Sequence, residues 1–444
     1  MATDGLLTVL EECRISPPPN TVGERSLPLT FFDLGWLLVH PMHQVFFFEF
    51  PHSKSHFMQQ IAGSLRRRPF ASNLIVFPNQ QKKPEIRHVE GDSVVLRIAE
   101  SGLGFDELVG NHPRACHKFY PLVPPLGRVD KLSGFLAIPL FAVQVTFFEN
   151  RGIAIGITNH HVLCDATTKF GFLKVWSSIA RDGTDGLLLA KGYLPSFDRP
   201  VKYPDALDEI FMTQRGVETL NEGFQPPQLS GLPPKVRATF ILTKEQINSV
   251  KKWVSAELPT LGYVSSFSVA CAYIWSCVAK SRIGIQERDT EDELERFVCS
   301  ANFRSRMDPP VPETYFGNCV GPCIAITKSA MLSSDKGFLI AVESIGKAIS
   351  ETVNNKDGIV KNAESWFEMV FKPTAKIPVK IGVAGTPKLR NYDIDFGWGK
   401  PKKYETVSID SNGSMSINAC RESSEDLEIG LSLPAKQMDA FVTI

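Results

Sequence analysis

A stretch rich in glycine, proline and aspartate lies near the middle of the chain and constrains its fold more than any other feature. Between Asp182 and Pro234 it carries turn-forming runs such as 182–186 (Asp-Gly-Thr-Asp-Gly) and 231–234 (Gly-Leu-Pro-Pro). Such runs interrupt helices and strands and are typical of connections between domains. A chain of 444 residues holds roughly two or three domains. We therefore predict one domain over 1–182 and another over 235–444, joined by a connection over 183–234.

The part before this connection mixes helical and strand patterns. Helical spacing appears at Phe57, Ile61 and Leu65, and again at Phe170, Leu173 and Trp176. Runs of β-branched and aromatic residues predict strands over 74–77, 93–98, 141–148 and 153–158. The apolar stretch 31–50 is interrupted by charged residues, histidines and a proline, so we read it as buried strand and loop rather than a membrane span.

The part after the connection also mixes helices and strands. A strand is predicted over 238–242, followed by a capping box in which Thr243 and Gln246 begin a helix through 247–254. A second helix is expected over 267–280, with Ser265 or Ser266 as its cap. Further on, Asn412-Gly413 predicts a hairpin between strands over 405–410 and 415–420. The sequence therefore predicts a mixed α/β fold in both halves.

Charge and cysteine content restrict the partners and the compartment. Lys and Arg number 48, as do Asp and Glu, so no net charge attracts nucleic acid or an anionic membrane. Nine scattered cysteines without a paired CxxC array indicate a reduced, intracellular protein. Asp4, Glu11 and Glu12 are unlike a signal or transit peptide. We expect a cytosolic protein, a monomer without nucleic-acid or membrane partners.

His161 is the residue best placed for chemistry. An apolar strand over 152–158 runs into Asn159-His160-His161, and Asp165 follows four residues after His161. A neutral histidine in a loop after a strand is suited to take a proton from a hydroxyl, and Asp165 would fix that loop or orient the ring. Cys164 reads as buried filler more readily than as a nucleophile. Adjacent histidines on extended backbone point to opposite faces, so we expect no metal site at His160 and His161.

Two further motifs carry less weight when each is taken alone. The run 395–399 (Asp-Phe-Gly-Trp-Gly) suits a bulged strand with a buried aromatic residue. The run 309–319 begins with prolines and ends in Tyr-Phe-Gly-Asn-Cys, and it reads as a stiff connection into a strand. Together with the histidine motif over 161–165, however, the three stand in the order found in the BAHD family of plant acyl-CoA-dependent acyltransferases. The chain also resembles that family over 9–18 and 29–33, and 315–319 resembles its anthocyanin and phenolic glucoside malonyltransferases.

The resemblance implies two chloramphenicol-acetyltransferase-like domains with a channel at their interface. It also implies that His161 deprotonates a sugar hydroxyl, which attacks the thioester directly, without a metal or a permanently bound cofactor. Asp165 would turn away from the channel and hold the histidine loop. Asp395 would pair with Arg304 or Arg306, with Gly397, Trp398 and Gly399 supporting that structure. Ser265 and Ser266, and more weakly Arg237, would lie near the CoA moiety.

The donor and the acceptor follow from the same resemblance. Lys169 stands where malonyl-using relatives carry a basic residue, and a buried cation would compensate the malonyl carboxylate. The expected substrates are malonyl-CoA and an anthocyanin, flavonoid or other phenolic glucoside. A hydroxycinnamoyl or acetyl donor stays open. An inactive glucoside-binding protein also stays open, because the chain is shorter than expected near 64–70 and at its end.

Overall fold

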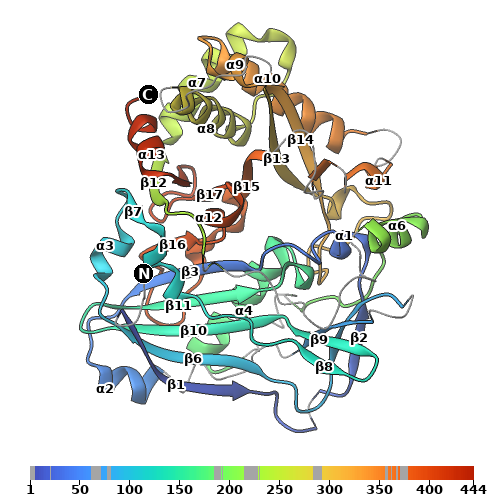
Figure 1. The fold of residues 1–444 in the computed structure, drawn as a ribbon, viewed down its shortest axis with the longest axis vertical. Helices are drawn as coiled ribbons and strands as arrows, with labels where there is room; N and C mark the ends of the chain where they lie inside the picture. The colour runs from blue at the N-terminus through green and yellow to red at the C-terminus, as the bar shows by residue number, and fades with distance from the viewer. Residues whose placement is uncertain are drawn as a thin grey trace.

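Three sheets form the framework of the protein in a computed structural model (Figure 1). The structure describes residues 6–20, 22–61, 72–77, 82–184, 192, 194–214, 229, 231–283, 293–355, 359–361, 363–366, 369–370 and 379–444. The first sheet has the order β1 (Leu7–Ile15), β6 (Val94–Ser101), β10 (Phe141–Phe148), β11 (Gly152–Asn159), β3 (Met42–Glu49), β16 (Lys403–Thr406). The second has the order β14 (Val320–Lys328), β13 (Leu294–Asn302), β15 (Val379–Ala384), β17 (Met415–Ala419), β18 (Leu427–Leu433), β12 (Val236–Leu242), β7 (Arg114–Ala115). The third has the order β2 (Arg25–Pro28), β5 (Glu85–His88), β4 (Asn73–Val76), β9 (Phe135–Pro139), β8 (Asp130–Leu132).

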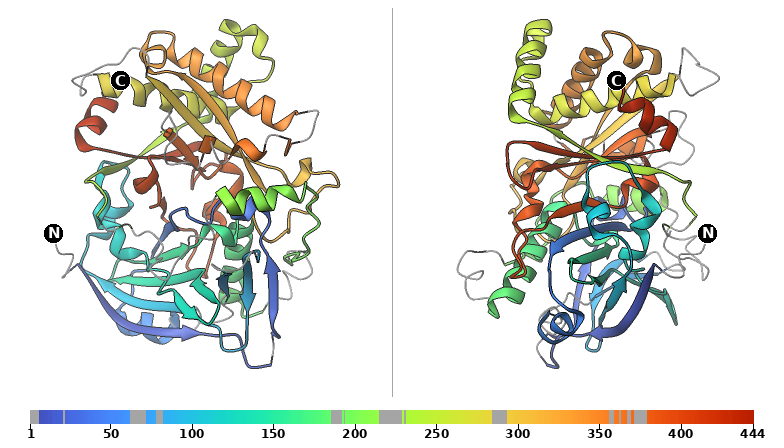
Figure 2. Two further views of the ribbon diagram at one scale, coloured as in Figure 1. Left: turned by 45° about the vertical axis from the view of Figure 1, so that its right-hand side comes forward. Right: turned by 90° about the vertical axis from the view of Figure 1, so that its left-hand side faces the viewer.

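Both halves of the chain contain helices. Those from the first half and the connection are α1 (Phe31–Leu34), α2 (Lys54–His56), α3 (Phe105–Val109), α4 (Ala166–Asp182) and α6 (Ala206–Gln214). Those from the second half are α7 (Lys244–Glu257), α8 (Ser266–Ile283), α9 (Ser329–Ser333), α10 (Gly337–Val353), α11 (Ala363–Trp366), α12 (Ile409–Asn412) and α13 (Ala435–Phe441). Figure 2 shows the first half as the lower body and the second half above it. The mixed α/β fold is therefore confirmed.

Each half contributes a strand to the sheet of the other. β16, from the second half, pairs antiparallel with β3, and β7, from the first half, pairs antiparallel with β12. α6 of the connection lies against α1. The core around the first sheet likewise includes Phe303, Tyr315 and Phe396 from the second half. The two halves are thus held together by backbone pairing and shared core, which keeps residues from both halves at fixed positions in a site between them.

The local patterns agree with the structure where neighbouring residues decide the conformation. Thr243 accepts a hydrogen bond from the Gln246 amide at 3.3 Å, and the Gln246 side chain accepts one from the Thr243 amide at 2.9 Å. The predicted capping box is therefore confirmed. The stretch 31–50 contains the short helix α1 in addition to the expected buried strand. Of the spacing at 57, 61 and 65, residues 57–61 form a helical turn, whereas Leu65 and the shortened stretch 64–70 lie outside the described residues.

The hairpin predicted at Asn412-Gly413 is wrong. β16 and β17 do not pair with each other, because β16 joins β3 and β17 lies between β15 and β18. Between them, α12 ends at Asn412, and the next residue, Gly413, has a φ of 68° in the left-handed region. A glycine after an asparagine suits the end of a helix as well as a hairpin turn, and here it ends a helix.

Candidate active site

His161 lies directly after a strand whose position is fixed on both sides. β11 runs antiparallel to β10 and to β3, and every residue of β11 is buried. After Asn159 the backbone forms one 3₁₀ turn over His161–Leu163, and α4 then begins with Asp165 as its cap. The Asp165 carboxylate accepts a hydrogen bond from the Thr168 amide at 3.1 Å. A buried strand and a capped helix therefore hold the histidine loop from its two ends.

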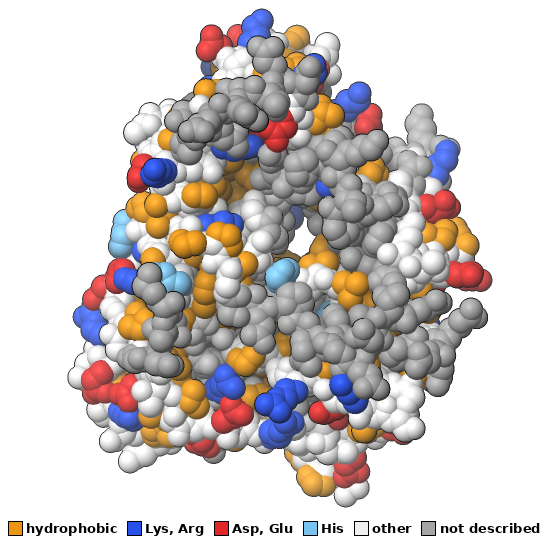
Figure 3. Space-filling view, in the orientation of Figure 1, with side chains coloured by type: hydrophobic (Ala, Val, Ile, Leu, Met, Phe, Trp, Pro, Cys, Tyr) orange, Lys and Arg blue, Asp and Glu red, His pale blue; other side chains and the backbone are white. Residues whose placement is uncertain are grey.

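The imidazole of His161 is half-buried and lies against an indole ring. The ring centroids of His161 and Trp36 are 3.8 Å apart, and their planes differ by 8°. Burial, and after it the charge of the Lys169 ammonium, lower the pKa of His161 to about 4, while Asp165 acts in the opposite direction. His161 is therefore neutral near pH 7, the state in which a histidine accepts a proton. In the space-filling view an opening passes through the middle of the molecule, with a histidine side chain at its lower edge (Figure 3).

Asp165 is held by a residue from the second half of the chain. Arg304 Nη1 lies 2.7 Å from one carboxylate oxygen of Asp165, and Nη2 lies 3.1 Å from the other. The Cys319 amide donates to the same carboxylate at 3.0 Å. The Asp165 and Arg304 side chains are 3% and 0% exposed. This arrangement agrees with a role for Asp165 in fixing the histidine loop.

The expected pairing of Asp395 with Arg304 or Arg306 is wrong. Arg304 binds Asp165, and Arg306 Nη1 donates to the carbonyl of Asn302. Asp395 instead lies 3.7 Å from Arg181 Nη1, near the end of α4. The sequence motifs did not indicate a partner for Asp395 on α4, because an ion pair between residues far apart in sequence leaves no pattern in either segment.

Asp395 and the two glycines after it build a tight loop. Asp395 Oδ1 accepts hydrogen bonds from the amides of Gly397 and Gly399, at 2.7 and 3.0 Å. Both glycines have positive φ, 103° and 84°, which other residues adopt only with strain. Trp398 lies edge-on against Phe48 of β3, with ring centroids 5.5 Å apart. The loop thus fastens the second half of the chain to the strand beside β11.

Asn318 is a central residue of the site that sequence reasoning missed. Its backbone and side-chain amides donate to Asp33 Oδ1 at 3.0 and 2.9 Å, and its side chain also donates to the His161 carbonyl at 3.0 Å. Asp33 and Asn318 are fully buried. An acidic residue inside the apolar stretch 31–50 was the only signal for this contact, because a buried carboxylate requires donors.

The rest of the Tyr-Phe-Gly-Asn-Cys run is fastened to α4 and to the connection. Thr168 Oγ1 lies 3.0 Å from the Tyr315 carbonyl and 3.1 Å from the Gly317 carbonyl. Arg199 donates to the Tyr315 hydroxyl at 2.5 Å and to the Phe316 carbonyl at 2.9 Å. The motif over 315–319 is therefore a clamp on the histidine loop and not a connector only.

Lys169 is buried on α4, one helical turn after its cap. Its side chain is among the buried charged groups at 5% exposure, so the alternative of an exposed helix lysine does not apply. No described carboxylate forms an ion pair with its ammonium, and burial lowers its pKa to about 8. The charge of this ammonium lowers the pKa of His161. A buried cation beside the histidine is available to an anionic group of a substrate.

Three other residues were expected to lie near the CoA moiety of the acyl donor: Ser265, Ser266 and Arg237. Ser265 caps α8, since its hydroxyl accepts from the Ser268 amide at 2.9 Å, and Ser266 is the first residue of that helix. Arg237 is 1% exposed and binds Asp410 and Glu405 at 3.0 and 3.5 Å. The expectation that Arg237 contacts CoA is therefore corrected: its charge is used inside the protein.

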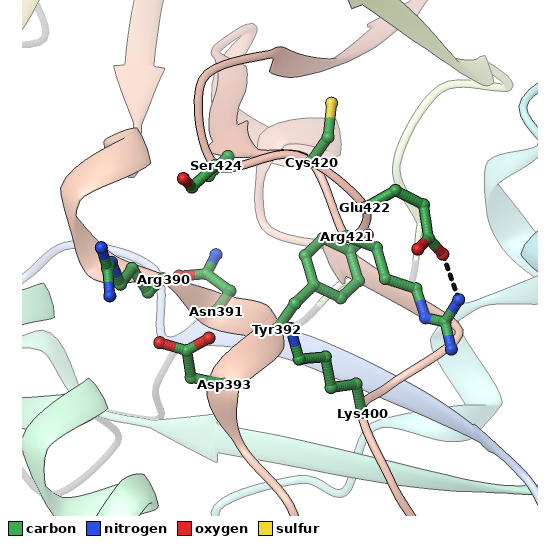
Figure 4. A pocket seen from close by; sticks show the side chains of 10 residues that line it. Arg390, Asn391, Tyr392, Asp393, Lys400, Cys420, Arg421, Glu422 and Ser424 are labelled. Carbon is green, nitrogen blue, oxygen red and sulfur yellow. Dashed lines mark hydrogen bonds and ion pairs between the residues drawn. The ribbon is translucent and has the colours of Figure 1, made fainter.

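Two cavities found in the described part of the chain are not lined by His161. One, of about 280 Å³, lies around Tyr392, Lys400 and Arg421, and the ion pair of Arg421 with Glu422 stands at its edge (Figure 4). The other, of about 460 Å³, adjoins it and reaches Asn111.

Among the described residues no three His, Cys, Asp or Glu side chains are grouped as metal ligands. No described helix is long and apolar enough to cross a membrane.

Comparisons with known proteins agree with this geometry. The chain matches the family model described as "Transferase family" over residues 112–443. It is 50% identical to the malonyl-coenzyme A:anthocyanin 3-O-glucoside-6''-O-malonyltransferase of Dahlia pinnata, with 98% of this chain and 96% of that protein covered. The chain belongs to the BAHD family and is an acyl-CoA-dependent O-acyltransferase. This acyltransferase is also 38% identical to phenolic glucoside malonyltransferase 1 of Nicotiana tabacum, with 93% of this chain and 92% of that protein covered.

Solved structures share the fold of the acyltransferase. Vinorine synthase matches with a TM-score of 0.68 at 19% identity, covering 98% of this chain and 96% of that chain. F. graminearum TRI101 complexed with ethyl coenzyme A matches with a TM-score of 0.62 at 13% identity, covering 95% and 97%. The fold class expected from the sequence is thereby confirmed, and the family model and the 50% identical relative confirm the family resemblance.

Proposed function

We propose that this acyltransferase moves a malonyl group from malonyl-CoA to a sugar hydroxyl of an anthocyanin, flavonoid or other phenolic glucoside. The observation that carries the proposal is the buried Lys169 ammonium beside a neutral His161. The malonyltransferases that resemble the chain support the same donor. The protein would act as a cytosolic monomer, and the nine free cysteines support a reducing compartment.

His161 would act as the general base. Its Nδ1 is buried, which leaves Nε2 to accept the proton of the sugar hydroxyl. The oxygen then attacks the thioester carbonyl, the C–S bond breaks, and the CoA thiolate leaves with the proton that His161 returns. General base catalysis of this kind contributes about 10²–10⁴ in rate. Asp165 and Arg304 hold the loop, so that the ring keeps its position through these steps.

Lys169 would bind the malonyl carboxylate. A malonyl group brings an anion into a site where this ammonium has no described carboxylate partner, and a charge-assisted hydrogen bond would form between them. Pairing would also offset the effect of the Lys169 charge, which lowers the pKa of His161. A malonyl donor would therefore make the base stronger as it binds, whereas an acetyl donor would not.

The CoA moiety would lie near Ser265 and Ser266 at the beginning of α8, where the N-terminal end of a helix favours a phosphate. The regions 1–182 and 235–444 would act as the two domains of the site, with 183–234 as the connection. The opening in Figure 3 would be the channel between them, reached by the two substrates.

A donor comparison tests the proposal. Purified protein receives malonyl-CoA, acetyl-CoA or coumaroyl-CoA with an anthocyanin 3-glucoside, and CoA release and product mass are followed. We expect the highest kcat/KM with malonyl-CoA, and Lys169→Met should lower that value about 10-fold or more while acetyl-CoA use changes little. Lys174→Met, on the same helix but only partly buried, is the matched control. Equal losses with both donors would remove the role of Lys169, and glucoside binding without CoA release from any donor would favour the inactive binding protein.

A further inference from the structure

Trp36 and His161 form a nearly parallel stack that no motif predicts. The ring centroids lie 3.8 Å apart with planes 8° from parallel, which is direct van der Waals contact across the two faces. Trp36 follows α1, far from the histidine in sequence, and its side chain is half-buried. The Lys169 ammonium disfavours a protonated His161, since its charge lowers the pKa of the imidazole. The indole face is thus the aromatic surface on which the imidazole lies.

Hydrogen bonds from Asn318 link the two segments that carry Trp36 and His161. Asn318 donates to Asp33 Oδ1 twice, at 3.0 and 2.9 Å, and to the His161 carbonyl at 3.0 Å. Asp33 in turn accepts from the Thr30 amide at 2.9 Å, and its carbonyl accepts from the Trp36 amide at 3.0 Å. Buried hydrogen bonds therefore fix the segment that carries the indole relative to the loop that carries the imidazole.

We propose that Trp36 is a positioning residue that holds His161 face to face and stabilises its imidazolium as the sugar hydroxyl loses its proton. The proposal rests on the proposed general-base function. In that step the O–H bond breaks, the imidazole gains the proton, and a positive charge appears in a site that is largely shielded from water. The negative face of an indole attracts a cation lying over it, and tryptophan is the strongest of the aromatic side chains in this respect. The attraction between the indole face and a positive imidazolium arises only as the proton is transferred, so it acts on kcat.

A series of fluorinated tryptophans at position 36 tests this directly. Mono-, di- and trifluorotryptophan keep nearly the shape of the indole while withdrawing electrons from its face. We expect kcat to fall stepwise along the series, with both KM values changing less than about twofold. Trp36→Phe should retain more activity than Trp36→Leu, whose kcat should fall about 3- to 30-fold. The same substitutions at Trp253, an exposed residue of α7, are the matched control and should leave kcat unchanged.

The outcomes separate this proposal from the proposed function. A wild-type protein that releases no CoA from any donor contradicts the general-base function itself. An active wild type whose kcat is the same across the fluorinated series contradicts the stabilising role, even if Trp36→Leu fails to fold. Changes confined to KM would make Trp36 a substrate-binding residue and would also overturn the proposal.

Discussion

Breaking the ion pair of Asp165 and Arg304 should lower both the free energy of unfolding and kcat. The two side chains meet in two hydrogen bonds of 2.7 and 3.1 Å, and they are 3% and 0% exposed. Arg304 Nη2 also lies 3.2 Å from the carbonyls of Tyr315 and Gly317. Asp165→Asn would leave this guanidinium charged and buried without a carboxylate. Removing one partner of a buried pair costs about 3–5 kcal/mol.

A double variant tests the expected loss of unfolding free energy. In Asp165→Asn with Arg304→Met neither charge is left buried, so its loss of unfolding free energy should be smaller than the sum of the single losses by about 2–4 kcal/mol. Urea unfolding measures this coupling. The kcat of each single variant should fall at least about 10-fold, because the histidine loop loses its anchor. Arg306→Met is the control, since Arg306 is exposed and donates to the carbonyl of Asn302.

Two results would refute this reasoning. Free-energy losses that add within about 0.5 kcal/mol would mean that the buried charges do not depend on each other. A kcat unchanged in Asp165→Asn would mean that the clamp does not position His161. Stability loss with unchanged kcat would leave the pair a structural feature of the interface between the halves.

Three further predictions follow from the same site. Lys169→Met should raise the pKa of His161 above about 4, so the acid limb of kcat/KM for malonyl-CoA should move to higher pH; an unmoved limb would contradict their proximity. Gly317→Ala, at a φ of 137°, should cost about 1–3 kcal/mol in urea unfolding, whereas Gly171→Ala, with open space around it on α4, should not destabilise. Burial lowers the pKa of His160 to about 3, so its contribution to stability is lost as pH falls below about 6.5; His160→Gln should reduce the decline at pH 5 by about 2 kcal/mol, and an equal decline would contradict this.

Local signals in the sequence predicted the elements of the fold well. The strand over 153–158, the cap at Thr243 and the cap at Ser265 each depend on residues within one turn or one strand. The hairpin at Asn412-Gly413 was wrong for a related reason. The dipeptide determines a left-handed glycine, but the neighbouring strands determine whether a hairpin or a helix end uses it.

The sequence places two residues of the candidate site together where one motif contains both, and it misses or misassigns the contact where a motif contains only one partner. His161 and Asp165 share a loop, and the structure holds them together. The arginine expected for Asp395 was wrong, and no arginine was expected for Asp165: Arg304 binds Asp165, and Arg181 lies by Asp395. These pairs are separated by more than a hundred residues, so only the tertiary fold brings them together. The same separation in sequence explains why the contact of Asn318 with Asp33 and the ring stack on His161 were missed.

The central claim is that His161 transfers the proton of a glucoside hydroxyl during malonyl transfer. Single-turnover mixing of enzyme, malonyl-CoA and an anthocyanin 3-glucoside, followed by mass spectrometry, measures that step directly. The account predicts one CoA released for each glucoside heavier by one malonyl group, and a rate at least about 100-fold lower for His161→Ala with both substrates still bound. A His161→Ala protein that forms the malonyl glucoside at nearly the wild-type rate would contradict it.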